Sequence, residues 1–219
     1  MTIRKGKNLS VRFVFSEARL WRYLLKELSE YLDTLAIRVD PEKGVSIRAM
    51  DPSHVMLIEL EAPPVAFEEF KADKSVDVIL NLEQASKILR RASKSDKFLL
   101  SASETEVVLG FISKNGVERF FRVPSLSGSF EEVPELELDL KNRAKIVGSL
   151  FSNTISLLEK AGDVLSITAE ENGVVISASS EMGELAFQFT IDGGTLMDYT
   201  PPEQPYTNHY TLEYITVAK

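Results

Sequence analysis

Two stretches of the chain repeat one pattern: TLAIRVDPEKGVSIRAMD begins at Thr34, and VLSITAEENGVVISASS begins at Val164. In each stretch, apolar residues alternate with polar residues on both sides of an acidic turn that contains glycine, which predicts a β-hairpin. The matched positions lie about 130 residues apart, and LEQASKIL from Leu82 has a counterpart in LEYITVAK from Leu212. An amphipathic helix pattern precedes each hairpin. We therefore predict a duplicated unit of about 120 residues, with chance similarity between two hairpins as the alternative.

A segment of different composition separates the two copies. Residues 123–139, VPSLSGSFEEVPELELD, contain two prolines, a serine- and glycine-rich middle and then acidic residues, which predicts an extended linker. The expected organisation is a first domain at 1–122, the linker at 123–139 and a second domain at 140–219. Each domain is expected to be α+β, with helices packed on antiparallel sheets. Judged by the repeat, the second copy lacks about 30 residues, so we expect an incomplete second domain that is poorly stable alone.

The composition excludes several classes of protein. The 219 residues include no cysteine and two histidines, which excludes a disulfide scaffold, a thiolate zinc site and a cysteine nucleophile. No apolar run is long enough for a membrane span and no signal peptide is recognisable, so a soluble cytoplasmic protein without a membrane partner is expected. No phosphate-binding glycine loop or nucleophile elbow occurs, and neither a metal nor a cofactor is predicted.

Charge is distributed unevenly along the chain. The net charge is −8, but residues 1–122 hold 20 basic and 18 acidic side chains, whereas residues 123–219 hold 5 and 15. The first domain can therefore carry a basic surface although the whole chain is acidic.

Two predicted helices of the first domain have basic outward faces. The first begins at the N-cap Ser16 and runs to about Leu32. Its apolar face is predicted to hold Leu20, Leu24, Leu28, Leu32 and Leu35, and its opposite face Arg19, Arg22 and Lys26. The second begins after the N-cap Asn81, with Leu82, Ala85, Ile88, Leu89 and Ala92 inward and Lys87, Arg90, Arg91 and Lys94 outward. Such stripes suit phosphate contact, which is independent of base sequence, and a solvated charged face is the alternative.

The corresponding helix of the second copy differs. It is expected near residues 143–160, with Val147, Leu150, Phe151, Ile155 and Leu158 inward. Its outward face carries serine, asparagine and lysine side chains and is mostly neutral, so any contact with phosphates would be weaker there.

Several stretches together resemble a known family. These are GVSIRAMDPSHVMLIEL from Gly44, NLEQASKIL from Asn81, the acidic linker and the second copy, and MDPSHV is the most specific of them. The chain resembles the DNA polymerase sliding clamps of the proliferating cell nuclear antigen family, in their archaeal form, over about residues 10–219. The resemblance implies a non-enzymatic processivity factor. Three such subunits close into a ring around duplex DNA, with helices lining the hole and sheets outside.

The resemblance also implies roles for individual residues. DNA in the hole would meet Arg19, Arg22, Lys26, Lys87, Arg90, Arg91, Lys94 and Lys114. A groove for short peptides with aromatic anchors would be formed by Met50, His54, Val55, Leu126, Val133 and Pro134. For Met50 and Val55 the alternative is plain core packing, which is favoured for Val55. Ring closure would pair edge strands near Glu118–Val123 and Glu184–Phe189, with Glu118, Phe120, Arg122, Leu185, Phe187 and Phe189 at the subunit interface.

The implied partners are duplex DNA and other clamp subunits, in a homotrimer or a heterotrimer. Short peptide motifs would bring DNA polymerase, the clamp loader, nucleases and ligase, and the protein would be cytoplasmic and associated with the nucleoid. The short second copy and its neutral helix depart from the family pattern. The alternative function is a shortened, clamp-like paralogue that binds partners without closing a ring. A third is an enzyme with a duplicated α+β fold and a site near His54.

Overall fold

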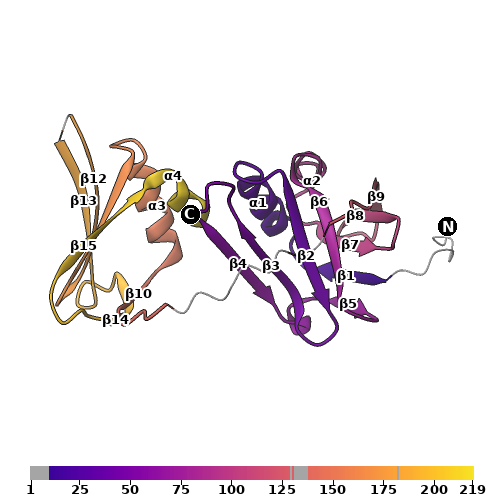
Figure 1. The fold of residues 1–219 in the computed structure, drawn as a ribbon, viewed down its shortest axis with the longest axis horizontal. Helices are drawn as coiled ribbons and strands as arrows, with labels where there is room; N and C mark the ends of the chain where they lie inside the picture. Colours follow the sequence, from indigo (N-terminus) through magenta and orange to yellow (C-terminus); the bar gives the residue numbers. More distant parts are fainter. Residues whose placement is uncertain (1–9, 129, 131–137, 182) are drawn as a thin grey trace. The chain divides into compact units, whose positions relative to one another are not determined.

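The fold was analysed in a computed structural model of the chain, which describes residues 10–128, 130, 138–181 and 183–219. The chain divides into two compact units, Met1–Pro134 and Glu135–Lys219, and this division falls within the expected linker. Each unit combines helices with sheets in which every described strand pairing is antiparallel (Figure 1). The predicted α+β class with two similar halves is therefore confirmed.

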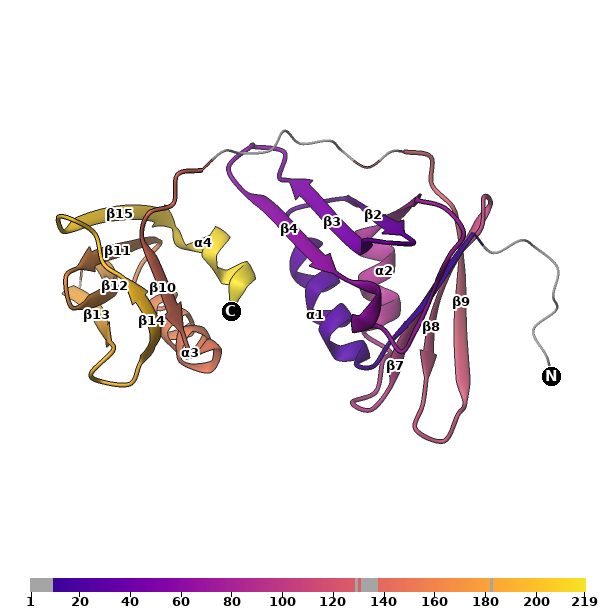
Figure 2. The same ribbon diagram turned by 90° about the horizontal axis from the view of Figure 1, so that it is seen from below.

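The first unit contains two sheets and two principal helices. Its elements are β1 (Val11–Phe15), α1 (Ala18–Leu28), β2 (Thr34–Asp40), β3 (Gly44–Met50), β4 (Leu57–Ala62), the 3-10 turn η1 (Pro64–Ala66), β5 (Glu69–Ala72), β6 (Val76–Asn81), α2 (Leu82–Leu89), β7 (Lys97–Ala102), β8 (Glu106–Ile112) and β9 (Glu118–Pro124). The strand orders are β5-β1-β7-β8-β9 and β4-β3-β2-β6. Helices α1 and α2 lie side by side (Figure 2).

Aromatic rings form the centre of this unit's core. Phe13, Trp21 and Phe98 come from β1, α1 and β7, and their ring centroids lie 5.0 to 6.1 Å apart. Such tilted and edge-on contacts add to the stabilisation that burial of the rings already provides. The core therefore joins one sheet to the helix that carries the first basic stripe.

The second unit repeats most of this arrangement. Its elements are β10 (Arg143–Ile146), α3 (Gly148–Leu158), β11 (Val164–Glu170), β12 (Gly173–Ser180), β13 (Gly183–Thr190), β14 (Leu196–Thr200), β15 (Tyr206–Thr211), α4 (Leu212–Ile215) and the 3-10 turn η2 (Thr216–Ala218). Its four-stranded sheet, β13-β12-β11-β15, has the same order as β4-β3-β2-β6. Helix α3 starts and ends 130 residues after α1, and the same offset relates β11 to β2 and β15 to β6. The predicted duplication is thus visible element by element.

Some predicted details are wrong. Leu20 is 54% exposed, because the buried face of α1 is centred on Trp21 and Leu25 instead. The helix begins after Glu17, without a side-chain cap, and it ends at Leu28 rather than near residue 32. Periodicity alone places an apolar stripe only to within about one residue on a helix whose flank also carries leucines.

The second helix also differs from its prediction at one end. Asn81 is the N-cap, and its Oδ1 accepts a hydrogen bond of 2.8 Å from the backbone N–H of Gln84, as expected. All five residues predicted to face the core are buried. The helix ends at Leu89, however, so Arg91 and Lys94 lie in the turn that leads to β7.

The predicted helix of the second unit is shorter too. Residues 143–146 form β10, the counterpart of β1, and pair with β14, so the helix begins only at Gly148. Leu150, which was expected in the core, is 38% exposed. Ile155 and Leu158 are fully buried, as predicted.

Candidate functional site

The outward face of α1 carries the first group of predicted DNA contacts. Arg19 and Arg22 are half-buried, and Lys26 is exposed. The Lys26 ammonium donates a 2.7 Å hydrogen bond to the Glu27 carboxylate, which raises the pKa of Lys26. Tyr23, which the sequence analysis did not single out, is 49% exposed among these cations, and the Arg22 guanidinium lies 5.5 Å from its ring centroid. The face is therefore cationic and partly aromatic.

The second group of cations follows α2. Lys87, Arg90, Arg91 and Lys94 are all exposed. Lys87 forms an ion pair with Glu83 one turn earlier, so an acidic side chain partly neutralises this cation of the stripe. The hydrogen bond from Lys87 lowers the pKa of the Glu83 carboxyl.

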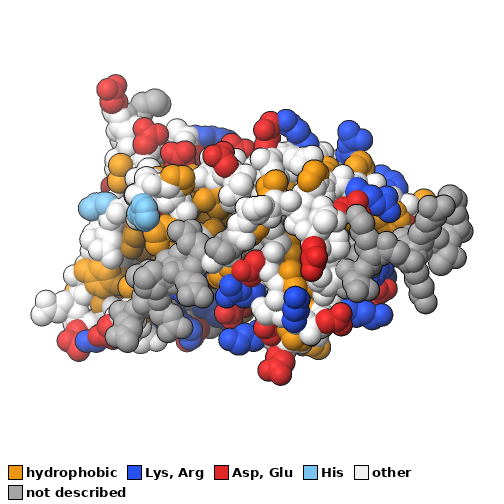
Figure 3. Space-filling view, turned by 45° about the vertical axis from the view of Figure 1, so that its right-hand side comes forward, with side chains coloured by type: hydrophobic (Ala, Val, Ile, Leu, Met, Phe, Trp, Pro, Cys, Tyr) orange, Lys and Arg blue, Asp and Glu red, His pale blue; other side chains and the backbone are white. Residues whose placement is uncertain are grey.

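The two groups lie on the neighbouring helices α1 and α2 or in the turn directly after α2, whereas Lys114 lies elsewhere. Helices α1 and α2 lie side by side (Figure 2), so the exposed cations of the two helices lie on neighbouring elements. Lys114 lies in the turn between β8 and β9, and it is exposed. The face shown in Figure 3 mixes Lys and Arg with Asp and Glu. The cations of the two helices are thus the part of the prediction that the fold brings together.

A buried carboxylate organises the loop between β3 and β4. Asp51 is 3% exposed, and its carboxylate accepts backbone hydrogen bonds from Ser53 (3.0 Å), Val55 (2.8 Å) and Met56 (2.6 Å). The Ser53 hydroxyl donates a further one. These donors, the Ser53 hydroxyl foremost, lower the pKa of Asp51 to about 2. His54 adopts a φ of 58°, in the left-handed region, which the bonds to Asp51 hold in place.

The loop presents three predicted groove residues. Met50 is half-buried, and its sulfur lies 3.0 Å from Nδ1 of His54. Both histidines of the chain lie at the surface (Figure 3). Val55 is 65% exposed, so the favoured alternative of core packing is wrong for this residue. The backbone N–H of Val55 donates a hydrogen bond to the buried Asp51 carboxylate, and the Val55 side chain points outward.

The remaining predicted groove residues belong to the linker. Leu126 is 40% exposed and lies beside a small crevice against β6, α2 and β8. Val133 and Pro134 lie outside the described residues.

The strands predicted to form the subunit interface, β9 and β13, are edge strands of their sheets. Among the described residues, β9 pairs with β8 alone and β13 pairs with β12 alone. Glu118 and Arg122 are exposed on β9, and Leu185 is 37% exposed on β13. Phe189, however, is buried in the core of the second unit, and Phe187 is half-buried against it. Free backbone groups at a sheet edge can pair with another strand.

A groove joins the β9 edge to the cations of α2. It encloses about 430 Å³. Its lining residues are Gln84, Lys87, Ile88, Arg91, Phe120, Phe121, Arg122 and Val123. The sequence analysis missed this groove because it forms between elements about 30 residues apart, whose proximity depends on the sheet order. The edge of β9 therefore combines apolar surface with positive charge.

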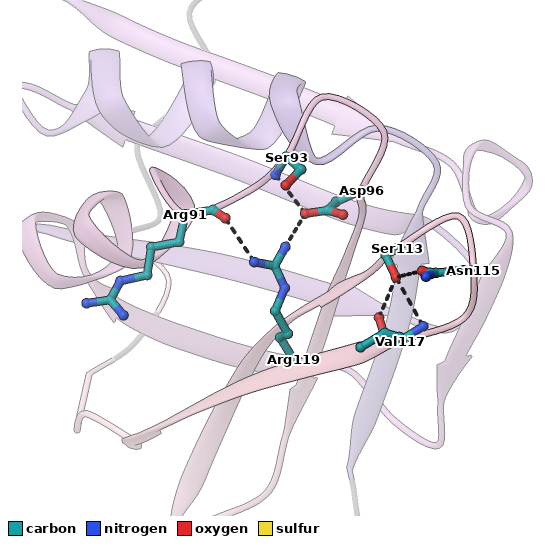
Figure 4. A network of polar contacts seen from close by, with 7 residues as sticks. All are labelled: Arg91, Ser93, Asp96, Ser113, Asn115, Val117 and Arg119. Atoms are coloured by element: carbon teal, nitrogen blue, oxygen red, sulfur yellow. Dashed lines mark hydrogen bonds and ion pairs between the residues drawn. The ribbon is translucent and has the colours of Figure 1, made fainter.

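Arg119 fixes β9 to the end of α2 (Figure 4). Its guanidinium forms an ion pair with Asp96, which is 2% exposed, and donates a 3.3 Å hydrogen bond to the carbonyl of Arg91. Asp96 also accepts a 2.7 Å bond from the backbone N–H of Ser93. A cation at the carboxyl end of a helix is electrostatically favourable. This network sets the separation between the edge strand and the cationic turn.

The profile of the proliferating cell nuclear antigen N-terminal domain matches residues 10–123, which is the first unit from β1 to β9. The chain belongs to the proliferating cell nuclear antigen family. It is 32% identical to DNA polymerase sliding clamp 3 of Aeropyrum pernix over 206 residues, which cover 94% of this chain and 81% of that relative. It is 30% identical to the DNA polymerase sliding clamp of Thermococcus onnurineus, covering 92% and 80%.

Solved structures of the family show the same fold. A chain of the PCNA2–PCNA3 complex from Sulfolobus tokodaii superposes with a TM-score of 0.85 at 27% identity, covering 94% of this chain and 83% of that one. PCNA from Thermococcus kodakaraensis superposes with a TM-score of 0.84 at 20% identity, covering 95% and 84%. These comparisons confirm the family resemblance, the clamp fold and the role of a sliding-clamp subunit. In the part of the chain that the structure describes, no helix is long and apolar enough to span a membrane.

Proposed function

We propose that this sliding-clamp subunit forms part of a ring that encircles duplex DNA, catalyses no reaction itself and tethers DNA polymerase and other replication and repair enzymes. The observation that carries the proposal is the surface of α1 and α2, where Arg19, Arg22, Lys26, Lys87 and Arg90 point outward. Lysine and arginine attract phosphates without reading bases, which is the interaction that a protein sliding on DNA needs.

Ring closure is supported by the two sheet ends. The β9 edge carries Arg122, which is paired with Glu106 at 3.4 Å, and is flanked by Arg91, whereas the β13 edge is flanked by Glu181 and Glu184. A basic edge and an acidic edge on one chain favour head-to-tail association, and a head-to-tail contact closes into a ring when its rotation fits.

The composition of the ring has two candidate answers. The neutral outward face of α3 supports a ring in which sister subunits supply more of the positive charge. The S. tokodaii structure is a complex of two different clamp proteins, which also supports a heteromeric ring. A homotrimer is the other answer.

Partner enzymes are proposed to bind at the loop between β3 and β4, together with the linker. His54 and Val55 are exposed there beside Met50. Exposed apolar side chains on a loop that Asp51 holds in one conformation suit the docking of a short peptide with aromatic anchors. Binding then costs little entropy, because the loop is already ordered.

Native mass spectrometry of the full chain, alone and mixed with sister clamp subunits, tests ring formation. We expect a species of three subunits in at least one mixture. Arg122→Glu, at the basic edge, is expected to reduce that species at a given concentration. Lys71→Glu, on the end strand β5 of the same sheet, is the matched control and should leave it unchanged. A chain that stays monomeric in every mixture would contradict the ring and favour a clamp-like paralogue that binds partners only.

A further inference from the structure

The described part of the linker follows one strand of the first unit. Leu126 lines a small crevice together with Asn81, the last residue of β6, and a Cβ on Gly128 would lie 3.2 Å from the Ile79 side chain. Further along, the backbone N–H of Phe130 donates a 3.0 Å hydrogen bond to Asp77. The contacts move from residue 81 to residue 77 as the linker runs from 126 to 130. The described linker residues, from Leu126 to Gly128 and then Phe130, therefore follow β6 in the antiparallel direction.

Phe130 is held at two points by one ion pair. Arg38 and Asp77 face each other across β2 and β6, and two guanidinium nitrogens of Arg38 bond the carboxylate at 2.8 and 3.1 Å. The same guanidinium lies 4.4 Å from the centroid of the Phe130 ring. The Asp77 carboxylate thus accepts a hydrogen bond from the backbone of Phe130, while the Arg38 guanidinium lies over the Phe130 ring. The Arg38 hydrogen bonds, with that of Phe130, lower the pKa of Asp77, so the carboxylate is ionised at neutral pH.

The cluster lies on the face of the sheet that points away from the core. Ile37, Val39 and Val78 are buried in the core, and Arg38 and Asp77 alternate with them along β2 and β6. Changing the cluster therefore removes no core side chain. We therefore expect such a change to alter the position of the linker rather than the packing of the first unit's core.

We propose that Arg38 and Asp77 form a clamp that holds Phe130 and thereby positions the linker, including Leu126, as one wall of the partner-binding groove. The inference rests on the proposed groove, and it assigns these three residues as positioning residues. With β9 ending at Pro124 and Phe130 held, only residues 125–129 lie between two fixed points. A wall that is held before binding spares a peptide the entropic cost of ordering it.

Three variants of the full chain test the clamp. Phe130→Ala removes the ring and Phe130→Tyr keeps it. Arg48→Gln, which breaks an ion pair between β3 and β4 of the same sheet and leaves Phe130 and the Arg38–Asp77 pair in place, is the control. Binding of a fluorescent synthetic peptide with two adjacent phenylalanines is measured by anisotropy. Hydrogen exchange of residues 125–130 is followed by mass spectrometry, and the thermal midpoint is recorded for each variant.

We expect Phe130→Ala to weaken peptide binding by about threefold to tenfold and to speed exchange in the linker, with the midpoint unchanged. Phe130→Tyr and Arg48→Gln should behave as the wild type. Faster exchange with unchanged affinity would overturn the positioning role, and unchanged exchange would overturn the clamp itself. If the wild-type chain fails to bind the peptide, the proposed groove fails and the positioning role with it, while the exchange data still show whether the clamp holds the linker.

Discussion

Helices α1 and α3 occupy equivalent places in the two units and differ mainly on one side. Leu28 and Leu158 are equivalent and both fully buried. On the outward faces, Arg19, Arg22 and Lys26 of α1 correspond at the same offset to serines in α3. Trp21, Leu25 and Leu28 of α1 correspond to Phe151, Ile155 and Leu158, so the two helices share apolar packing residues and differ in the residues that face outward. In this chain, the residues that pack the fold and those proposed to contact DNA lie on opposite sides of one helix.

The loops after the second hairpin strands differ as well. In the first unit, six residues from Asp51 separate β3 from β4, and they present His54 and Val55. In the second unit, β12 ends at Ser180 and β13 begins at Gly183. The longer loop requires a buried carboxylate to satisfy its backbone, and it is the loop on which we place partner binding.

The cores differ in extent. The first unit's core draws on two helices and both sheets. In β6, Val78 and Leu80 are buried, whereas Asn208 and Tyr210 at the equivalent positions of β15 are exposed. Less buried apolar surface gives less stabilisation, so the second unit is expected to be the weaker of the two.

The largest expected effect comes from matched core truncations. Leu28→Ala is expected to lower the free energy of unfolding of the first unit by about 2–5 kcal/mol, through lost burial and a cavity. Leu158→Ala should lower the free energy of unfolding of the second unit by a similar amount, which leaves that unit only marginally stable. Trp21, the single tryptophan, reports the first unit by fluorescence, and far-UV circular dichroism reports both. A Leu158→Ala chain whose tryptophan transition moves as far as that of Leu28→Ala would show that the units do not unfold independently.

The next effect separates the two outward faces. Replacing Arg19, Arg22 and Lys26 of α1 together by alanine should weaken retention on duplex DNA about tenfold or more at low salt. The slope of log affinity against log salt should fall by about two to three, whatever the DNA sequence. Alanine at Ser149, Ser152 and Ser156 is the matched control on α3, with little expected effect. Equal losses in the two triple variants would remove the proposed asymmetry between the faces.

The smallest effect concerns the loop held by Asp51. Because its pKa is lowered in the folded chain to about 2, its stabilising contribution is present above the ordinary carboxyl pKa, near 4, and is lost as pH falls toward about 2. The amide proton shifts of Val55 and Met56 in NMR should therefore stay constant from neutral pH to about 4 and change below it. In Asp51→Asn they should be displaced already at neutral pH. Amide shifts in the turn between β12 and β13 serve as the control, and a wild-type loop that titrates like this turn would contradict the role of Asp51.

Local patterns predicted much of the fold. The alternation around Gly44 and Gly173 identified both hairpins, and Asn81 was recognised as an N-cap, because these features depend on residues close in sequence. The family resemblance suggested roles for more of the candidate site residues than the spacing of residue types did. The errors arose where residues distant in sequence determine which side chains are buried. Trp21 rather than Leu20 faces the core, because its ring packs against rings from β1 and β7.

By itself, the sequence determined the duplication, the two basic stripes, the neutral face of α3 and the family, since each rests on residue types at regular spacing. The tertiary structure alone decided which groups meet across the chain. Phe130 reaches Asp77 from 53 residues away, and Arg119 reaches Asp96 from the next strand but one. Contacts of this kind depend on strand order and register, and these are set by the packing of the whole unit rather than by any local pattern.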